Sequence, residues 1–215
     1  MKNIKSKITG YFPKKLKTYF KKFRDFNALN QIDKKMLNFI NYKHGFYIEC
    51  GANDGVDQSN TWYFEKKKNW NGLLIEPIPH LYNQLIKNRS NKNFFSKTCL
   101  VSNLYKKDLI ELNYNDLQTS LIDKSDKIIS AKTSTLTKLL NEYNCPLTID
   151  FFSLDVEGYE FNVIEGIDFS KYIFKYFLIE TNNFDKLNKI LTDKNYKFLK
   201  QLTIHDYLFK HNKLT

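Results

Sequence analysis

The sequence predicts an α/β fold: a mostly parallel sheet with helices on both faces and an antiparallel hairpin at one edge. Three observations predict it. From residue 45 onward, short apolar runs alternate with amphipathic stretches, which is typical of right-handed βαβ units. The apolar runs contain few polar residues, as strands buried on both faces do. The last two runs have no helix between them, so we expect them to pair as a hairpin.

The first half of the predicted domain alternates regularly. Phe46–Cys50 is an apolar run that ends in a glycine-rich turn, and a helix is expected over about 60–68. Leu73–Glu76 is the second strand, stopped by two prolines. The next helix places Leu81, Leu85 and Ile86 on one face, and Phe94–Val101 is the third strand.

The second half begins with a segment that is harder to interpret. Within residues 103–132, "DLIELNY" predicts an extra strand and "NDLQTSLIDKSD" a polar loop. Regular alternation then resumes, with strands Ile149–Asp155 and Phe174–Glu180. Helices are expected over 136–143, over 160–165, where Gly166 ends the helix, and over 184–194. "YKFLKQLTIHDYLF" is the expected hairpin.

Composition narrows the class of protein. The chain has 215 residues, 42% of them hydrophobic, which allows a real core. No apolar run approaches the roughly 18 residues that a membrane span needs, and no apolar signal segment follows the N-terminus. The three cysteines show no metal-binding or CxxC spacing, which is typical of reduced, buried thiols. We therefore expect a cytoplasmic protein.

The net charge of +11 is concentrated at the N-terminus. Residues 1–40 carry eleven Lys or Arg and two acids, so they form a basic leader of +9 before a domain of +2 over 41–215. From Leu16, apolar positions step by three or four, which predicts an amphipathic helix. Three uses stay open: contact of residues 1–26 with an anionic surface on the inner membrane face, nucleic-acid binding, and packing on the domain. The near-neutral domain and the lack of a [DN]PPY motif weigh against nucleic acid.

The turn after the first strand predicts a ligand site. "ECGANDG" lacks the GxGxxG spacing of nicotinamide dinucleotide sites, which argues against a nicotinamide-dependent oxidoreductase, and it also lacks the phosphate loop GxxxxGK[ST]. Gly51 and Gly55 let a ligand approach the main chain. Glu49, Asn53 and Asp54 suit a cationic or zwitterionic group better than a pyrophosphate.

Glu76 adds a second constraint. It ends the second predicted strand, 21 residues after Gly55, where an acid can accept both hydroxyls of a ribose. A ligand with a ribose, a cation and no diphosphate fits S-adenosylmethionine.

Three acids follow the fourth predicted strand, in "FFSLDVEGYE". An extended chain through residue 157 would place Asp155 and Glu157 on one face, with Gly158 freeing the turn into the next helix. Asp155 is the first candidate for a general base, or for a ligand of a divalent metal, and Glu157 the second. Glu160 fits the first turn of a helix, and a lone His205 is more often structural.

These residues resemble the FkbM-type methyltransferase family over about residues 41–210. The motifs GANDG, SNT (59–61), IEP (75–77) and DVEGYE (155–160) occur in order. The resemblance implies a Rossmann-like class I methyltransferase fold with seven strands, and O-methylation of a sugar or another small hydroxyl compound, such as a lipid-linked saccharide. It implies that Glu49, Gly51, Asn53 and Glu76 hold S-adenosylmethionine, that Asp155 and Glu157 lie near its methyl group, and that Val101 and Ser102 lie by the adenine.

The chain departs from the family pattern at one position. Thr137 stands where the family often has Asp after Thr-x-Thr-Leu, at an expected helix start. The acceptor pocket is expected from loops such as 103–132, so the acceptor is not readable from the sequence.

Overall fold

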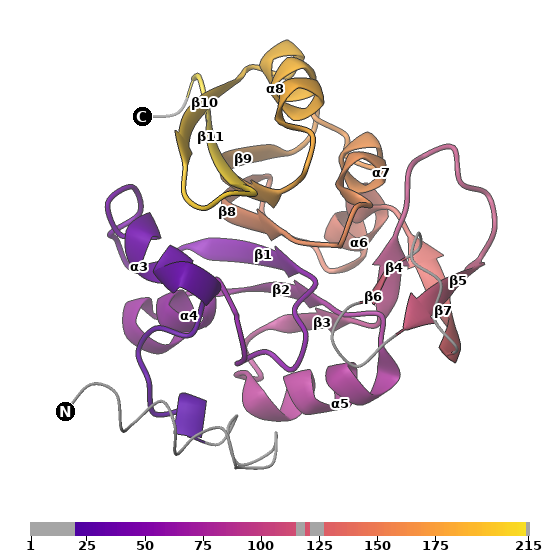
Figure 1. The fold of residues 1–215 in the computed structure, drawn as a ribbon, viewed down its shortest axis with the longest axis horizontal. Coiled ribbons are helices and arrows are strands. Elements are labelled where there is room, and N and C mark those ends of the chain that lie inside the picture. The colour runs from indigo at the N-terminus through magenta and orange to yellow at the C-terminus, as the bar shows by residue number, and fades with distance from the viewer. Residues whose placement is uncertain (1–19, 115–118, 121–126, 214–215) are drawn as a thin grey trace.

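The computed structural model describes residues 20–114, 119–120 and 127–213. A seven-stranded sheet lies in the middle of the described chain (Figure 1). In sheet order, its strands are β10 (Tyr196–Gln201), β11 (Asp206–His211), β9 (Ile173–Glu180), β8 (Thr148–Leu154), β1 (Phe46–Cys50), β2 (Asn71–Ile75) and β3 (Phe94–Ser96). Strand β11 runs antiparallel to β9 and β10, and the other neighbours pair in parallel. The predicted sheet, with its antiparallel edge hairpin, is confirmed.

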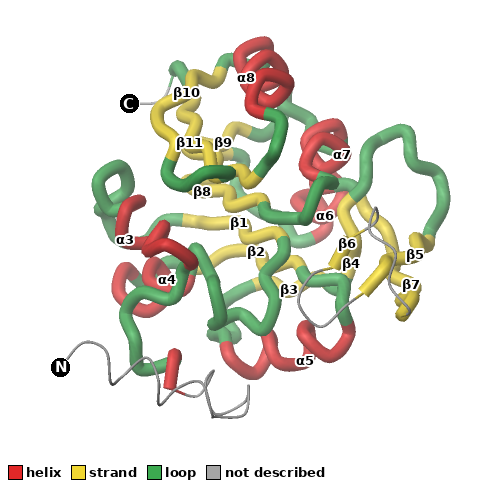
Figure 2. The backbone as a smooth tube through the Cα atoms, viewed as in Figure 1, coloured by secondary structure: helices red, strands yellow, loops and turns green. Residues whose placement is uncertain are grey.

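Helices cover both faces of this sheet. One apolar cluster joins it to α6 (Leu136–Glu142), α7 (Glu160–Glu165) and α8 (Phe184–Asp193). The other joins it to α3 (Ile32–Met36), which follows the short η2 (Leu29–Gln31), and to α4 (Trp62–Lys68) and α5 (Pro79–Asn88). Figure 2 shows the two groups of helices around the strands. Within β1 the side chains alternate, since Ile48 belongs to the first cluster and Tyr47 to the second.

A second, smaller sheet stands beside the first. Its strand order is β4 (Thr98–Leu100), β7 (Lys127–Ser134), β5 (Leu109–Tyr114) and β6 (Thr119–Ser120). It packs through Ile110 and Leu112 against Leu81 of α5. The predicted extra strand over "DLIELNY" is β5. Most of the predicted polar loop, 115–126, lies outside the described residues.

Two sequence predictions need correction. The expected strand Phe94–Val101 is two strands, because the chain leaves the main sheet after Ser96 and β4 pairs with β7 of the second sheet. The apolar run continues across the break because both sheets bury it. Ile86 is 41% exposed, since the helix that buries Leu81 and Leu85 turns it outward.

The leader is described only from residue 20 onward, so most of the predicted helix from Leu16 lies outside the described residues. Its later part packs on the sheet: Ile32, Met36 and Ile40 are buried in one cluster with Phe151 of β8. A domain boundary at residue 40 stays a prediction. In the part of the chain that the structure describes, no helix is long and apolar enough to cross a membrane.

Candidate functional site

The turn after β1 brings the ends of three strands together. Gly51 has φ +78°, and a Cβ added there would lie 1.9 Å from the carbonyl oxygen of Asp155, which follows β8. Gly55 has φ +80°, and a Cβ there would meet the side chains of Leu85 and Arg89. The sequence predicts ligand contact as the reason for both glycines, and the structure supplies another: the protein's own backbone and side chains leave no room. Gly51 is nevertheless exposed, unlike its neighbours Cys50 and Ala52.

Glu76 joins the end of β2 to this turn. Its Oε2 accepts from the backbone N–H of Asn53 at 2.9 Å, and its Oε1 accepts from the N–H of Ile78 at 2.9 Å. The side chain is 5% exposed, and burial raises the pKa of its carboxyl to about 7 although both N–H groups oppose the shift. Each oxygen keeps a lone pair, so the carboxylate can accept two further hydroxyls.

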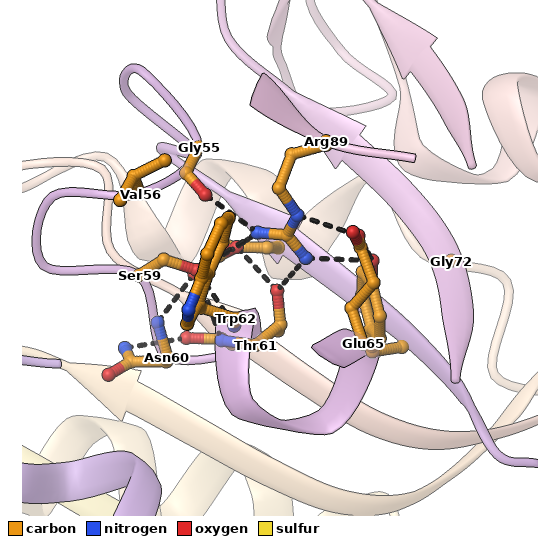
Figure 3. Close-up of polar contacts among 12 residues, drawn as sticks. Gly55, Val56, Ser59, Asn60, Thr61, Trp62, Glu65, Gly72 and Arg89 are labelled. Carbon is orange, nitrogen blue, oxygen red and sulfur yellow. Dashed lines mark hydrogen bonds and ion pairs between the residues drawn. The ribbon is translucent and has the colours of Figure 1, made fainter. Parts of the chain in front are cut away.

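Glu49 belongs to a polar network around Arg89. Figure 3 shows Ser59, Thr61 and Glu65 of this network around the guanidinium. The oxygens of Glu49 accept from Ser59 Oγ at 2.9 and 3.0 Å, from the Asn60 N–H at 2.7 Å and from Thr61 Oγ1 at 2.6 Å. Arg89 approaches it at 3.3 Å. The carboxylate predicted to hold a ligand thus has four protein donors and fixes the loop that follows the glycine turn. Its contact with a cofactor stays a prediction.

Arg89 holds a second buried acid, Glu65 of α4. The Arg89 Nε lies 2.7 Å from Glu65 Oε2, and the remaining guanidinium contacts include the Tyr47 hydroxyl at 2.8 Å. Burial alone would raise the pKa of Glu65, but the charge and hydrogen bond of Arg89 lower it to about 2. We call this set the Arg89 network; its members are Tyr47, Glu49, Ser59, Thr61, Glu65, Arg89 and Asn93.

A different group of acids lies at the carboxyl ends of β8 and β9. Asp155 follows β8, Glu180 ends β9, and Asp206 begins β11 opposite Glu180. Burial, then repulsion by Glu180 and the hydrogen bond that protonated Asp155 donates to Glu180, raise the pKa of Asp155 well above its usual range. Burial also raises the pKa of Asp206, against a hydrogen bond from Thr203. We call Asp155, Glu180 and Asp206 the acidic cluster. Among the described residues, no lysine or arginine forms an ion pair with Asp155 or Glu180.

Glu157 does not share a face with Asp155 as predicted. Strand β8 ends at Leu154, and Glu157 is exposed with φ +52°, so the chain is no longer extended there. Gly158, at φ +93°, makes the expected turn into α7. Glu160 begins α7 and accepts from the Gly158 N–H at 2.7 Å, in keeping with the first-turn interpretation.

The other predicted residues take these places. Val101 and Ser102 follow β4 of the second sheet, and Val101 packs with Ile78, whose N–H reaches Glu76. His205 is exposed in the β10–β11 turn, and its charge lowers the pKa of Asp206, although burial outweighs it. Within the described ranges, no three His, Cys, Asp or Glu side chains converge closely enough to hold a metal ion.

Sequence reasoning missed Glu180 and Arg89. Glu180 had a readable signal, because it ends a buried strand just as Glu76 and Asp155 follow theirs. Arg89 lies in "IKNRSNKN", which resembles a solvated helix end, and its burial depends on contacts with residues 24 and 40 positions away. No local pattern distinguishes it from a surface arginine.

Solved structures similar to this one include a methyltransferase FkbM. The methyltransferase FkbM from Methylobacillus flagellatus KT is 15% identical, with a TM-score of 0.51 over 81% of this chain and 45% of that chain. The fibrillarin pre-rRNA processing protein of Methanococcus jannaschii is 12% identical (TM-score 0.47, 80% and 68% covered). A precorrin-6y C5,15-methyltransferase from Geobacter metallireducens GS-15 is 11% identical (TM-score 0.46, 84% and 86% covered).

The likeness to the M. flagellatus protein concerns the fold, and the seven-stranded sheet with its antiparallel edge is the predicted Rossmann-like class I methyltransferase fold. This chain spans less than half of the length of the M. flagellatus protein. No curated protein matches the sequence. The model of the methyltransferase FkbM domain matches residues 49–198, which include the glycine turn, Glu76 and Asp155. The chain therefore belongs to the FkbM methyltransferase domain family.

Proposed function

We propose that the chain is an S-adenosylmethionine-dependent methyltransferase that methylates a hydroxyl of a saccharide or another small molecule. The observation that supports it best is the contact of the Glu76 carboxylate with the Asn53 N–H, beside the exposed Gly51. A carboxylate that can accept hydrogen bonds from two hydroxyls, Glu76, and an exposed stretch of backbone at Gly51 thus occur together at one edge of the sheet. Ligands of such folds bind at this edge.

The residues present fit the cofactor part by part. Glu76 would hold the ribose hydroxyls, and the backbone of Gly51 would lie under the amino-acid tail. Val101, in the apolar cluster beside Ile78, would contact the adenine. The acidic cluster offers negative charge to a sulfonium, whose methyl group is the one transferred. The backbone carbonyl of Asp155 lies against Gly51, so the residue that carries one carboxylate of the cluster adjoins the glycine turn.

Asp155 is the residue that we assign to proton removal from the acceptor hydroxyl. A base works best when its pKa lies near the working pH, and burial with Glu180 raises the pKa of Asp155 in that direction. Glu157, which is exposed, is the weaker candidate.

Calorimetric titration of S-adenosylmethionine into the full chain tests the cofactor site. We expect Glu76→Gln to weaken binding about tenfold or more, because hydrogen bonds to a charged group contribute roughly 1.5–3 kcal/mol. Glu142→Gln, at an exposed glutamate of α6, is the matched control and should bind as the wild type does. Equal affinity in the wild type and Glu76→Gln would remove the support for this site.

A further inference from the structure

A cavity of about 790 Å³ lies between the leader and the end of the sheet. It is within the size range of ligand sites, roughly 300–1,000 Å³. Leader residues from Lys21 to Lys35 form one side, and Asp57, Gln58, Thr203 and Ile204 form the other. A backbone bridge between Ala28 and Gln58 joins the two sides. The cavity is therefore built where the leader meets the loop after the glycine turn.

The cavity is connected to the acidic cluster through Thr203, although no member of the cluster lines it. Thr203 lines it, and the hydroxyl of Thr203 donates to Asp206, a member of the cluster. Asp206 in turn acts on Asp155, the proposed base. A methyl acceptor bound in this cavity would thus contact Thr203, and Asp206 connects Thr203 to the proposed base.

The lining combines amides with positive charge. Asn27, Asn30, Gln31 and Gln58 offer both donors and acceptors, which suits a polyhydroxyl ligand. Three cations, Lys21, Arg24 and Lys35, face one carboxylate, Asp57. Lys21 pairs with Asp57, and Lys35 donates to the Leu202 carbonyl at 2.7 Å. Among the described residues the Arg24 side chain has no such partner, so its charge is available to a ligand.

Two further features indicate a ligand. Asn27 is 9% exposed, and its Oδ1 has no hydrogen-bond partner among the described residues, although its Nδ2 donates to the Lys21 carbonyl. Buried polar atoms are rarely left unpaired, so this oxygen points to a missing donor. Asn30, Gln31 and Gln58 have φ of 51°, 56° and 61°. Left-handed backbone is unfavourable for glutamine, although asparagine adopts it more readily, and strained backbone of this kind gathers at ligand sites.

We propose that this cavity binds the methyl acceptor, and that the acceptor is an anionic saccharide, carrying a carboxylate or a phosphate. The proposal rests on the proposed function and names its substrate class. Sugar hydroxyls would meet the amide side chains that line the cavity, and the anionic group would pair with Arg24. The basic charge of residues 21–35 then serves substrate binding.

The test is calorimetry on the full chain with three probes: trigalacturonate, glucose 1-phosphate and neutral maltotriose. We expect at least one anionic probe to bind at least tenfold more tightly than maltotriose. Arg24→Gln should remove about tenfold of that affinity, the size of a charge-assisted hydrogen bond. Lys22→Gln is the matched control, because it removes one charge from the same exposed segment outside the cavity.

The two anionic probes separate a carboxylate acceptor from a phosphate acceptor. Equal binding of all probes, no binding of any, or the same loss in Arg24→Gln and Lys22→Gln would overturn the proposal. S-adenosylmethionine is titrated into each variant in parallel. If the acceptor proposal fails while S-adenosylmethionine still binds with unchanged affinity, the cofactor site is intact. If S-adenosylmethionine does not bind to the wild type, the proposed function itself has failed.

Discussion

Buried carboxylates occur in two regions of this molecule, and their surroundings differ. In the Arg89 network, Glu49 and Glu65 meet a guanidinium, hydroxyls and a backbone N–H. In the acidic cluster, Asp155 meets Glu180 and Asp206, which oppose its ionisation. Accordingly the pKa of Glu65 is lowered to about 2, while that of Asp155 is raised.

This difference distinguishes acids that stabilise the fold from acids that form the candidate site. The Arg89 network satisfies its charges internally and fixes the loop after the glycine turn. The acidic cluster keeps an electrostatic cost that folding does not need, which is characteristic of sites that bind or react. Four predictions test this contrast.

Removing Arg89 should have the largest effect. Arg89→Met leaves Glu49 and Glu65 buried without their cation, and breaking a buried pair in this way costs about 3–5 kcal/mol. Urea unfolding measures the loss. Lys87→Met, on the exposed side of α5, should change the free energy of unfolding by less than about 0.5 kcal/mol. A loss below about 1 kcal/mol in Arg89→Met would mean that the network is not the scaffold.

Stability should also depend on pH in two separate windows. Glu76 has a folded pKa of about 7, above its ordinary 4.5, so its contribution is full below 4.5 and is lost as pH rises through 7. That shift corresponds to about 3 kcal/mol. Glu65, with a folded pKa of about 2, contributes above 4.5 and loses its contribution as pH falls through 2.

Urea unfolding between pH 3 and pH 8 checks both directions. We expect the free energy of unfolding to fall between pH 5 and 8, and Glu76→Gln to flatten that fall. A wild-type curve that rises over this range would contradict the raised pKa of Glu76.

Asp155→Asn should separate activity from stability. It relieves the repulsion by Glu180, so the free energy of unfolding near pH 8 should stay the same or rise. Loss of a general base should slow methyl transfer at least about 100-fold, measured as S-adenosylhomocysteine release with an accepted saccharide. Asp193→Asn, exposed at the end of α8, should change neither quantity. Asp155→Asn with wild-type turnover would dismiss Asp155 as the base.

The smallest effect is expected at Ser59. Its hydroxyl donates to Glu49 and accepts from the Trp62 N–H at 3.1 Å and from Arg89 at 3.0 Å. Ser59→Ala leaves these groups underpaired, which costs about 1–3 kcal/mol. Thermal unfolding should show a lower Tm, with Ser90→Ala, whose hydroxyl makes a weaker contact at 3.3 Å, as the control. An unchanged Tm in Ser59→Ala would mean that Arg89 alone maintains the network.

The sequence predicts the sheet well because its signals are local. The buried strands are near-continuous apolar runs, and Glu76 and Asp155 directly follow two of them. The second sheet was only partly predictable: β4 continues the run of β3, and β7 is the amphipathic "KIISAKTS". Their separation depends on pairing between residues 98 and 132, which no short window contains.

The site divides in the same way. Positions at strand ends, including Glu180, can be read from the chain, because the carboxyl ends of parallel strands meet at one edge. The Arg89 network cannot, since Arg89 reaches Glu49 across 40 residues and Gly55 across 34. In the sequence, a glycine turn can indicate either contact with a ligand or close packing against the protein itself. Only the structure shows that Arg89 and Asp155 already occupy the space beside the glycines.

Proton release on cofactor binding tests most directly whether the methyl donor is held between Glu76 and the acidic cluster. S-adenosylmethionine is titrated calorimetrically at pH 7 in two buffers of different ionisation enthalpy, and S-adenosylhomocysteine, which lacks the sulfonium charge, in parallel. We predict that both ligands bind with proton release from Glu76, and that S-adenosylmethionine releases more because its cation favours ionised Asp155. Binding without proton release, or no binding of either ligand, would contradict that placement.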